Sequence, residues 1–172
     1  MSTEASSAPR FVVATVAQGR ASVKDDVAQI VIDELNAAKC TLIRHVTVNR
    51  ERVFIEQLVR HLADSNEADV VLLIGGAGLG PRDYTCEVVD DLADRRIEGF
   101  GEAFRRLLVD DLKTGVTAVL ARATACISNK CLVVALPRHP ESIRLAMKEL
   151  VIPIATTAVR VASGGGPVSV MW

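Results

Sequence analysis

The sequence predicts an α/β fold with a mostly parallel β-sheet, and three features support this prediction. Short apolar runs rich in β-branched residues, typical of strands buried on both faces, occur at residues 11–16, 70–74 and 131–136. Segments with helical periodicity lie between the strands. The resulting β-α-β-α-β order leaves crossovers of the length that parallel pairing requires, and such crossovers are right-handed.

The composition indicates one domain with an aliphatic core, because 49% of the 172 residues are hydrophobic and only 3% are aromatic. A formal net charge of −1 argues against a general basic surface for nucleic acid or anionic membrane. No apolar run approaches the roughly 20 residues that span a bilayer, and the N-terminus lacks the features of a signal peptide. We therefore expect a cytoplasmic protein with a disordered tail (1–9), a single domain (10–162) and a Gly-rich C-terminal tail (163–172).

The four cysteines are scattered and form no C-x-x-C pair, which favours reduced, mostly buried thiols over a disulfide framework or a zinc site. They are Cys40, Cys86, Cys126 and Cys131. We expect His45 and His61 to lie on the surface, whereas His139 falls in a candidate site loop.

The first half of the chain reads as two strand–helix pairs. After the strand at 11–16 comes a loop at 19–23, in which Ser22 is a plausible N-cap for a helix reaching residue 38. The second strand is expected at 40–48 and the second helix at 51–64. The apolar residues of the first helix are expected to lie on one face of that helix (Val27, Ile30, Val31, Leu35). Those of the second strand are expected to lie on one side of that strand (Leu42, Val46, Val48).

The second half is less regular. Helical stretches are expected at 87–94 and 102–112, while residues 116–125 fit either a helix or a strand. The buried strand at 131–136 stops at a turn bounded by Pro137 and Pro140. A last helical segment starts near Glu141, and Pro153 either interrupts it or starts another helix. We expect two arginine pairs to lie on solvated helix faces or in subunit contacts (Arg95-Arg96 and Arg105-Arg106).

A glycine-rich loop follows the central strand and reads Gly-Gly-Ala-Gly-Leu-Gly-Pro-Arg-Asp-Tyr-Thr at 75–85. Glycines allow a phosphate to approach the backbone closely, and the N–H groups of such a loop bind anions. Asp83 is then placed to hold a metal ion or polarise a ligand group. The alternative is a simple strand-to-helix turn with Asp83 on a solvated edge, because the loop is neither a P-loop nor a dinucleotide fingerprint.

Three strand ends are expected to converge. If the strands are parallel, the glycine loop, the turn at 137–140 and Asn49 all lie at one edge of the sheet. Ligands of open α/β sheets bind at this edge, so the convergence favours a ligand site over a simple turn.

The glycine loop, Glu-Gly-Phe-Gly-Glu-Ala-Phe-Arg at 98–105 and Leu-Val-Val-Ala-Leu-Pro-Arg-His-Pro at 132–140 together resemble the MogA/MoaB family of molybdenum-cofactor biosynthesis, which includes the gephyrin G domain. The resemblance covers roughly residues 11–162. It implies a three-layer α/β/α fold and a homotrimer or trimer-based oligomer. Active members bind molybdopterin and Mg-ATP, with Mg²⁺ as cofactor, and adenylylate the terminal phosphate of the pterin.

The resemblance assigns candidate roles to residues of this chain. It places a catalytic, metal-binding carboxylate at Asp83 and aligns Asn49 with the second functional aspartate of the family. Ligand-binding positions are Gly75, Gly76, Ala77, Gly78, Arg82, Thr85, Pro137, Arg138 and His139. Gly99, Gly101 and Glu102 match a segment that borders the site.

Several ligand-facing positions depart from the family pattern. Asn49 replaces Asp, Ala77 replaces Thr, and Arg138-His139 replaces Gly-Ser. The Asp-x-Ser-Gly element of the first helix appears as Asp26-Val27-Ala28-Gln29, and Ala121 replaces Ser. These changes leave three hypotheses: an adenylyltransferase in which Arg138 serves as a replacement phosphate clamp, a molybdopterin- or nucleotide-binding module without turnover, and an oligomeric scaffold.

Overall fold

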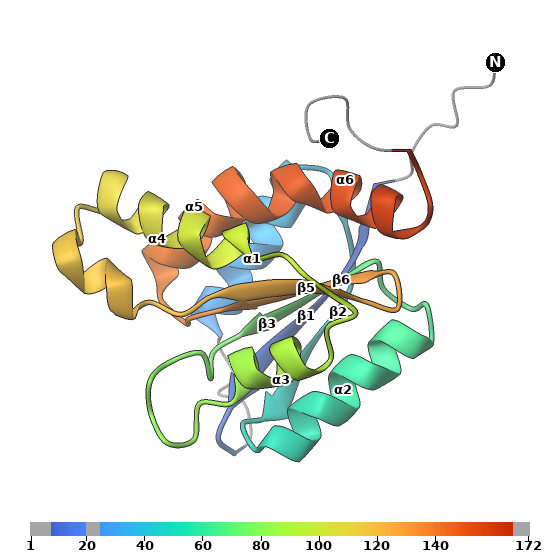
Figure 1. Ribbon diagram of the computed structural model, residues 1–172, viewed down its shortest axis with the longest axis horizontal. Coiled ribbons are helices and arrows are strands. Elements are labelled where there is room, and N and C mark those ends of the chain that lie inside the picture. Colours follow the sequence, from blue (N-terminus) through green and yellow to red (C-terminus); the bar gives the residue numbers. More distant parts are fainter. Residues whose placement is uncertain (1–7, 20–24, 167–172) are drawn as a thin grey trace.

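A six-stranded, mostly parallel sheet lies between two layers of helices in the computed structural model, which describes residues 8–19 and 25–166 (Figure 1). The strand order is β2-β1-β3-β6-β5-β4. The strands are β1 (Arg10–Ala17), β2 (Thr41–Asn49), β3 (Val70–Ile74), β4 (Arg95–Arg96), β5 (Thr124–Ser128) and β6 (Cys131–Leu136). The α/β/α architecture expected from the sequence is confirmed.

The helices divide between the two faces of the sheet. Figure 1 shows α1 (Asp26–Ala37), α4 (Gly99–Asp110), α5 (Pro140–Ala146) and α6 (Ile152–Ala162) on one face, and α2 (Arg52–Asp64) and α3 (Thr85–Asp91) on the other. A 3₁₀ helix spans Gly115–Leu120, and a π-helical turn spans Met147–Val151. Pro153, near the start of α6, has no N–H to donate to the preceding turn, so the regular α-helical ladder is interrupted there.

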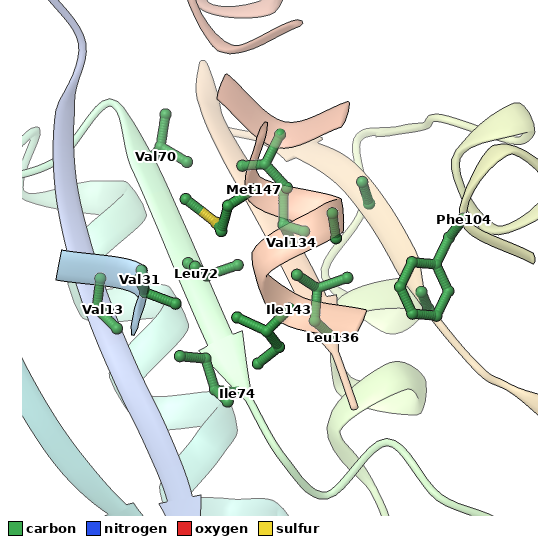
Figure 2. Close-up of a cluster of buried hydrophobic side chains, with 14 of the residues drawn as sticks. Val13, Val31, Val70, Leu72, Ile74, Phe104, Val134, Leu136, Ile143 and Met147 are labelled. Atoms are coloured by element: carbon green, nitrogen blue, oxygen red, sulfur yellow. The ribbon is translucent and has the colours of Figure 1, made fainter. Parts of the chain in front are cut away.

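Each face of the sheet has its own aliphatic core because the central strands are buried on both sides. Figure 2 shows the first core, in which Val13, Leu72 and Val134 of the strands meet Val31 of α1 and Ile143 of α5. The second core joins alternate strand residues to Ile55, Val59 and Leu62 of α2 and to Val88 and Val89 of α3. The continuous apolar runs of β3 and β6 follow directly from this double burial.

One predicted face is wrong. A β-bulge shifts the register between β1 and β2, so that Phe11 pairs with Leu42 while Val12 pairs with Arg44. The extra residue, Ile43, reverses the alternation of the strand. Leu42 therefore packs against the first core, whereas Val46 contacts the second.

The edge beyond β6 also differs from the prediction. Arg95 and Arg96 form a two-residue strand that pairs antiparallel with β5, rather than lying on a helix. Residues 116–125, which fitted either structure, divide between the 3₁₀ helix and the start of β5, and β5 runs antiparallel to β6. Helix α3 ends at Asp91, and α4 begins three residues earlier than expected, at Gly99.

The cap of the first helix is Asp25, whose carboxylate accepts a hydrogen bond of 3.1 Å from the N–H of Ala28. Ser22, the expected N-cap, lies outside the described residues, as do most of the loop expected at 19–23 and much of the two expected tails. Asp25 is a preferred N-cap residue type and directly precedes the apolar periodicity.

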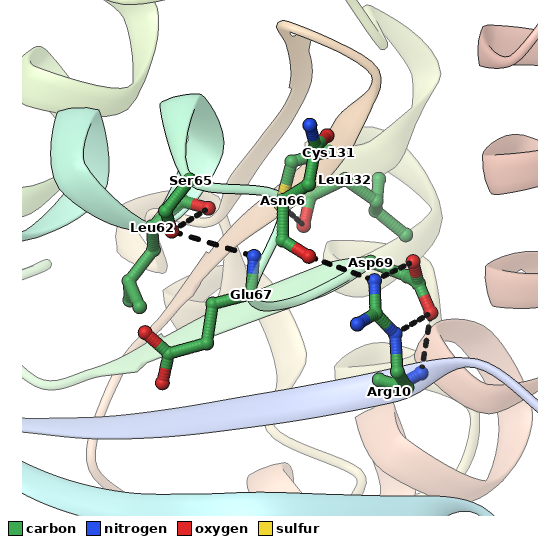
Figure 3. A network of polar contacts seen from close by, with 8 residues as sticks. All are labelled: Arg10, Leu62, Ser65, Asn66, Glu67, Asp69, Cys131 and Leu132. Atoms are coloured by element: carbon green, nitrogen blue, oxygen red, sulfur yellow. Dashed lines mark hydrogen bonds and ion pairs between the residues drawn. The ribbon is translucent and has the colours of Figure 1, made fainter.

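An ion-pair network closes the amino-terminal edge of the sheet. Figure 3 shows Asp69, just before β3, accepting hydrogen bonds from the backbone N–H and the guanidinium of Arg10 at 2.8 to 3.1 Å. The N–H of Leu132 donates to the backbone carbonyl of Asp69. These contacts join the starts of β1, β3 and β6 and leave the opposite edge to ligands.

None of the helices in residues 8–19 and 25–166 is long and apolar enough to cross a membrane.

Candidate functional site

Four parallel strands end at the same edge of the sheet, which confirms the predicted convergence of the loops. In the ladders, Ala17 of β1 pairs with Asn49 of β2, and Ile74 of β3 pairs with Leu136 of β6. The glycine loop and the turn at 137–140 therefore leave neighbouring strands side by side. The N–H of Gly75 donates to the carbonyl of Leu136 at 2.9 Å and joins the two segments.

The glycine loop turns sharply because two of its residues have conformations and neighbours that favour glycine. Gly75 has φ +100°, and a Cβ there would lie 2.8 Å from the carbonyl oxygen of Val16. Gly76 has φ +62°, and its Cβ would lie 2.4 Å from the hydroxyl of Thr85. The buried Thr85 hydroxyl donates to the carbonyl of Gly75 at 2.8 Å, so Thr85 holds the loop as it opens α3.

The loop leaves backbone donors without partners. Within residues 8–19 and 25–166, the N–H groups of Gly76, Ala77 and Gly78 donate no hydrogen bond to a protein acceptor. Successive free N–H groups of this kind form an anion-binding concavity. Ala77, which lacks the hydroxyl of the family threonine, is buried, and its methyl packs in the second core.

Asp83 folds back over the loop. One of its carboxylate oxygens accepts from the N–H of Gly80 at 3.0 Å, and a Cβ on Gly78 would lie 2.6 Å from that same oxygen. The other oxygen lies 3.7 Å from the Arg50 guanidinium. Arg82, the neighbouring candidate, is exposed. The structure thus places Asp83, but not the Arg82 side chain, against the glycine backbone.

Asn49 lies at the predicted strand end, but its side chain is engaged locally. Its amide oxygen accepts from the N–H of Glu51 at 3.1 Å and so closes the turn into α2. The loop after β2 approaches Asp83 through Arg50, the residue that follows Asn49, even though β1 lies between β2 and β3.

Arg122 ties the loop to α3. Its guanidinium donates to the carbonyl of Gly78 at 2.9 Å and to the carboxylate of Glu87. Burial lowers the pKa of Arg122, but the hydrogen bond to Glu87 and the nearby negative charges together outweigh this effect, and the pKa is raised from its usual value. Arg122 is therefore a permanent cation beside the loop.

A second polar cluster was not predicted from the sequence. The Thr15 hydroxyl donates to the Asp25 carboxylate at 2.5 Å and lies 2.9 Å from Nε2 of His45. Asp25 also accepts from the Arg138 guanidinium at 2.9 Å. Burial raises the pKa of Asp25, but the hydrogen bonds from Thr15, Ala28 and Arg138 outweigh it and hold the pKa below its usual value.

The cluster changes the interpretation of two predicted residues. His45, expected to be a surface residue, is half-buried against Thr15. Asp25, rather than the exposed Asp26, faces the site. A capping residue at 25 was the one local signal for this cluster, because its other members come from β1, from β2 and from a turn more than a hundred residues away.

The two residues that replace Gly-Ser in the last turn behave differently. Arg138 is anchored by Asp25, and its Cβ lies 3.8 Å from the position of a Cβ on Gly75, so it stands beside the glycine loop. His139 is the N-cap of α5 and contacts Ser142 through Nδ1 at 3.0 Å. Pro137 and Pro140 flank this pair, with Pro140 as the first residue of α5.

The segment around Gly101 lines a polar pocket of about 140 Å³ near the start of β5. Gly101 is required there because a Cβ would lie 2.7 Å from the carbonyl oxygen of Ala123. The pocket is lined by Asp90, Arg96, Ile97, Glu98, Gly101, Arg105, Ala123 and Thr124. Thr124 pairs with Ala135, next to the carboxyl end of β6, so the pocket adjoins the edge where the loops meet.

The residues around Asp83 do not fit a resident metal ion. No group of three or more His, Cys, Asp or Glu side chains suited to a metal occurs in the part of the chain that the structure describes. Asp83 has a backbone N–H at one oxygen and the Arg50 guanidinium near the other, and Asn49 is neutral and occupied. A hard divalent cation requires oxygen ligands that are not already facing donors.

Known proteins share both this fold and much of this sequence. A family model described as "Probable molybdopterin binding domain" matches residues 6–157. Molybdenum cofactor biosynthesis protein B of Bacillus subtilis is 32% identical over 158 residues, which cover 91% of this chain and 92% of that protein.

Two crystal structures superpose on most of the chain. One, of a molybdenum cofactor biosynthesis protein B, has a TM-score of 0.87 at 28% identity and covers 94% of this chain and 99% of its own. The other, of the molybdopterin biosynthesis enzyme MoaB from Thermus thermophilus, has a TM-score of 0.78 at 27% identity. The match covers 91% of this chain and 97% of that protein.

Proposed function

Because the chain belongs to the family of probable molybdopterin binding domains, with MoaB and MogA proteins as its relatives, we propose that it binds molybdopterin in the biosynthesis of the molybdenum cofactor. The observation that carries this proposal is the glycine loop. Among the described residues, three successive N–H groups of this loop have no protein acceptor, and the Cβ of Arg138, whose guanidinium is anchored by Asp25, lies beside the start of the loop at Gly75. A terminal phosphate suits both kinds of donor.

The polar cluster around Asp25 gives Arg138 a defined position. Asp25 is held by Thr15 and by the N–H of Ala28, so it fixes one end of the guanidinium fork while the side chain remains 40% exposed. The remaining N–H groups of the fork are then available to a phosphate. The turn at 137–140 therefore carries a charged side chain, that of Arg138, where the family pattern has the small residues Gly-Ser.

A titration of molybdopterin against the purified protein tests this proposal. We expect saturable binding that weakens about tenfold or more in Arg138→Ala, since hydrogen bonds to charged groups contribute about 1.5–3 kcal/mol. Arg60→Ala is the matched control, because Arg60 is exposed on α2 and its one ion pair among the described residues is with Glu56. Absence of saturable binding, or equal affinity in the two variants, would contradict the proposal.

Adenylylation of the bound molybdopterin is the second candidate function, and the position of Asp83 over the glycine loop favours it. An oxygen of the pterin phosphate would attack the α-phosphorus of ATP, and the bond to the pyrophosphate leaving group would break. The loop donors would align the two phosphates and offset their charge.

An assay for adenylylated molybdopterin, with ATP and Mg²⁺ supplied, separates the enzyme from the binding module. Product formation that disappears in Asp83→Asn supports the enzyme. We further expect Asn49→Asp to raise turnover if the enzyme is active. Binding without product in any of these proteins would favour a module without turnover.

We also propose a homotrimer or a trimer-based oligomer, as the family resemblance implies. The apolar side chains of Val109, Val116, Val119 and Leu120 gather at the end of α4 and on the following 3₁₀ helix, and all are exposed in the single chain. Burial of such a patch against other copies would favour assembly.

A further inference from the structure

Arg50 lies at this edge, and neither the sequence motifs nor the proposed function uses it. It follows β2 directly and is anchored there, since its backbone N–H donates to the carbonyl of Ala17 at 3.1 Å. Its guanidinium lies 3.7 Å from the Asp83 carboxylate, and the two side chains are only 32% and 21% exposed. Arg50 therefore places a positive charge from the loop after β2 next to Asp83 of the glycine loop.

The Arg50 guanidinium donates no hydrogen bond to any residue that the structure describes. The Nε atom of Arg50 is buried and finds no partner among the described residues. At 3.7 Å the contact with Asp83 is an ion pair that is longer than a normal hydrogen bond. A buried donor without an acceptor is unfavourable, so an acceptor that entered beside Asp83 would be favoured.

The charges around Asp83 also differ from those of a metal site. The Arg50 guanidinium lies 3.7 Å from one Asp83 oxygen, the permanent cation Arg122 donates to the carbonyl of Gly78 in the same glycine loop, and the end of β2 carries the neutral Asn49. The carboxylate is thus balanced by guanidinium groups of the protein itself. Glu51, the acidic residue of the same loop as Arg50, is exposed, and the described residues include no group of three or more His, Cys, Asp or Glu side chains that could hold a divalent cation.

We propose that Arg50 is the resident cation of the glycine loop. It pairs with Asp83 when the loop is empty and binds a phosphate oxygen of the ligand when the loop is filled, so that phosphate binding at this edge does not depend on a divalent metal. The inference rests on the proposed function only in assuming that a phosphate group occupies the loop. Arg50 is a ligand-binding residue and also positions Asp83.

Calorimetric titration with pyrophosphate, once with EDTA and once with MgCl₂ at equal ionic strength, tests the metal dependence directly. We expect the wild-type protein to bind with affinities that agree within about twofold in the two buffers. Arg50→Gln should weaken binding about tenfold or more in EDTA, as expected for loss of a charge-assisted hydrogen bond. Arg50→Lys should recover part of the loss, and Arg60→Ala should show none.

Two results would overturn the inference: binding that requires Mg²⁺, or an Arg50→Gln protein that is less stable but binds pyrophosphate as tightly as wild type. Failure of the proposed function is distinguishable, because molybdopterin would then not bind in either buffer. Molybdopterin binding that depends on Mg²⁺ would preserve the proposed function and reject the resident cation.

Titration with Mn²⁺, followed by loss of its free-ion electron paramagnetic resonance signal, provides a readout that needs no ligand. We expect no Mn²⁺ bound in the wild-type protein. The double variant Asn49→Asp/Arg50→Asp removes the cation and adds two carboxylates to the loop that contacts Asp83, so it should gain a Mn²⁺ site that Asp83→Asn abolishes. Stoichiometric Mn²⁺ binding to the wild type that disappears in Asp83→Asn would reject the proposal.

Discussion

Asp69 is a single residue whose ionisation couples this fold to pH. Burial raises its pKa, but hydrogen bonds from the side chain and backbone of Arg10 outweigh burial and hold the pKa below its ordinary value of 3.8. A carboxylate with a depressed pKa stabilises the folded state at pH values above its unfolded pKa. That stability is lost as the pH falls through the lower folded pKa.

Asp69→Asn is therefore expected to lower the free energy of unfolding by about 1–3 kcal/mol at pH 7 and by much less near pH 3. Urea unfolding at both pH values measures the difference. Asp111→Asn, at an exposed position without an ion pair in the described residues, serves as the control. An equal loss at both pH values would show that the interaction with Arg10 does not depend on the charge of Asp69.

At the same scale, the sequence predicted the backbone of the site better than its side chains. The glycines, Asp83 and Thr85 lie where the loop motif places them, because local turn geometry determines their positions. The contacts of Asp25 with Arg138 and of Arg50 with Asp83 join segments far apart in the chain. Only the ladder registers of the folded sheet bring these pairs together.

Helix α4 illustrates how one close contact positions a whole element. A Cβ on Gly101 would lie 2.7 Å from the backbone carbonyl of Ala123 and close to the Arg105 side chain, whereas a Cβ on Gly99 would meet nothing within 4 Å. The helix can therefore approach the segment before β5 only with glycine at position 101.

Gly101→Ala is expected to destabilise the protein by about 1–3 kcal/mol through overpacking. Gly99→Ala is expected to be neutral or to stabilise it by up to about 1 kcal/mol, because alanine has the higher helix propensity. Thermal unfolding of the two variants compares them. Similar melting temperatures for both variants would argue against this close contact.

Elements were predictable where burial determined their pattern. The continuous apolar runs at β1, β3 and β6 and the amphipathic face of α1 all appear as expected. β4 was missed because a two-residue exposed strand has no periodicity of its own. It forms because β5 offers it an antiparallel partner, which is a tertiary effect.

The reactivity of the four cysteine thiols depends on how tightly the whole molecule is packed. Burial raises the pKa of Cys86 to about 11 and the pKa of Cys126 and Cys131 to about 12, whereas Cys40 is only half-buried. A thiol reagent at pH 8 should therefore modify Cys40 first and reach the other three only on unfolding. Cys40→Ser should remove the fast phase, and rapid reaction of all four thiols would contradict the packed core.

The assembly proposed above makes a prediction at the same scale. Light scattering should give a mass of about three times the 18.4 kDa of one chain, or a multiple of it. If the exposed apolar patch forms the contact, Val116→Asp should reduce the mass, since Val116 is 86% exposed in the single chain and the substitution would leave its fold intact. An 18.4 kDa species for the unmodified protein would reject the oligomer.

The central claim is that molybdopterin binds with its phosphate at the glycine loop, and a crystal structure of the complex tests it most directly. We expect the phosphate within hydrogen-bond distance of the N–H groups of Gly76 to Gly78 and of the Arg138 guanidinium. A phosphate bound elsewhere on the molecule, with the loop donors and Arg138 left without ligand contacts, would contradict the account.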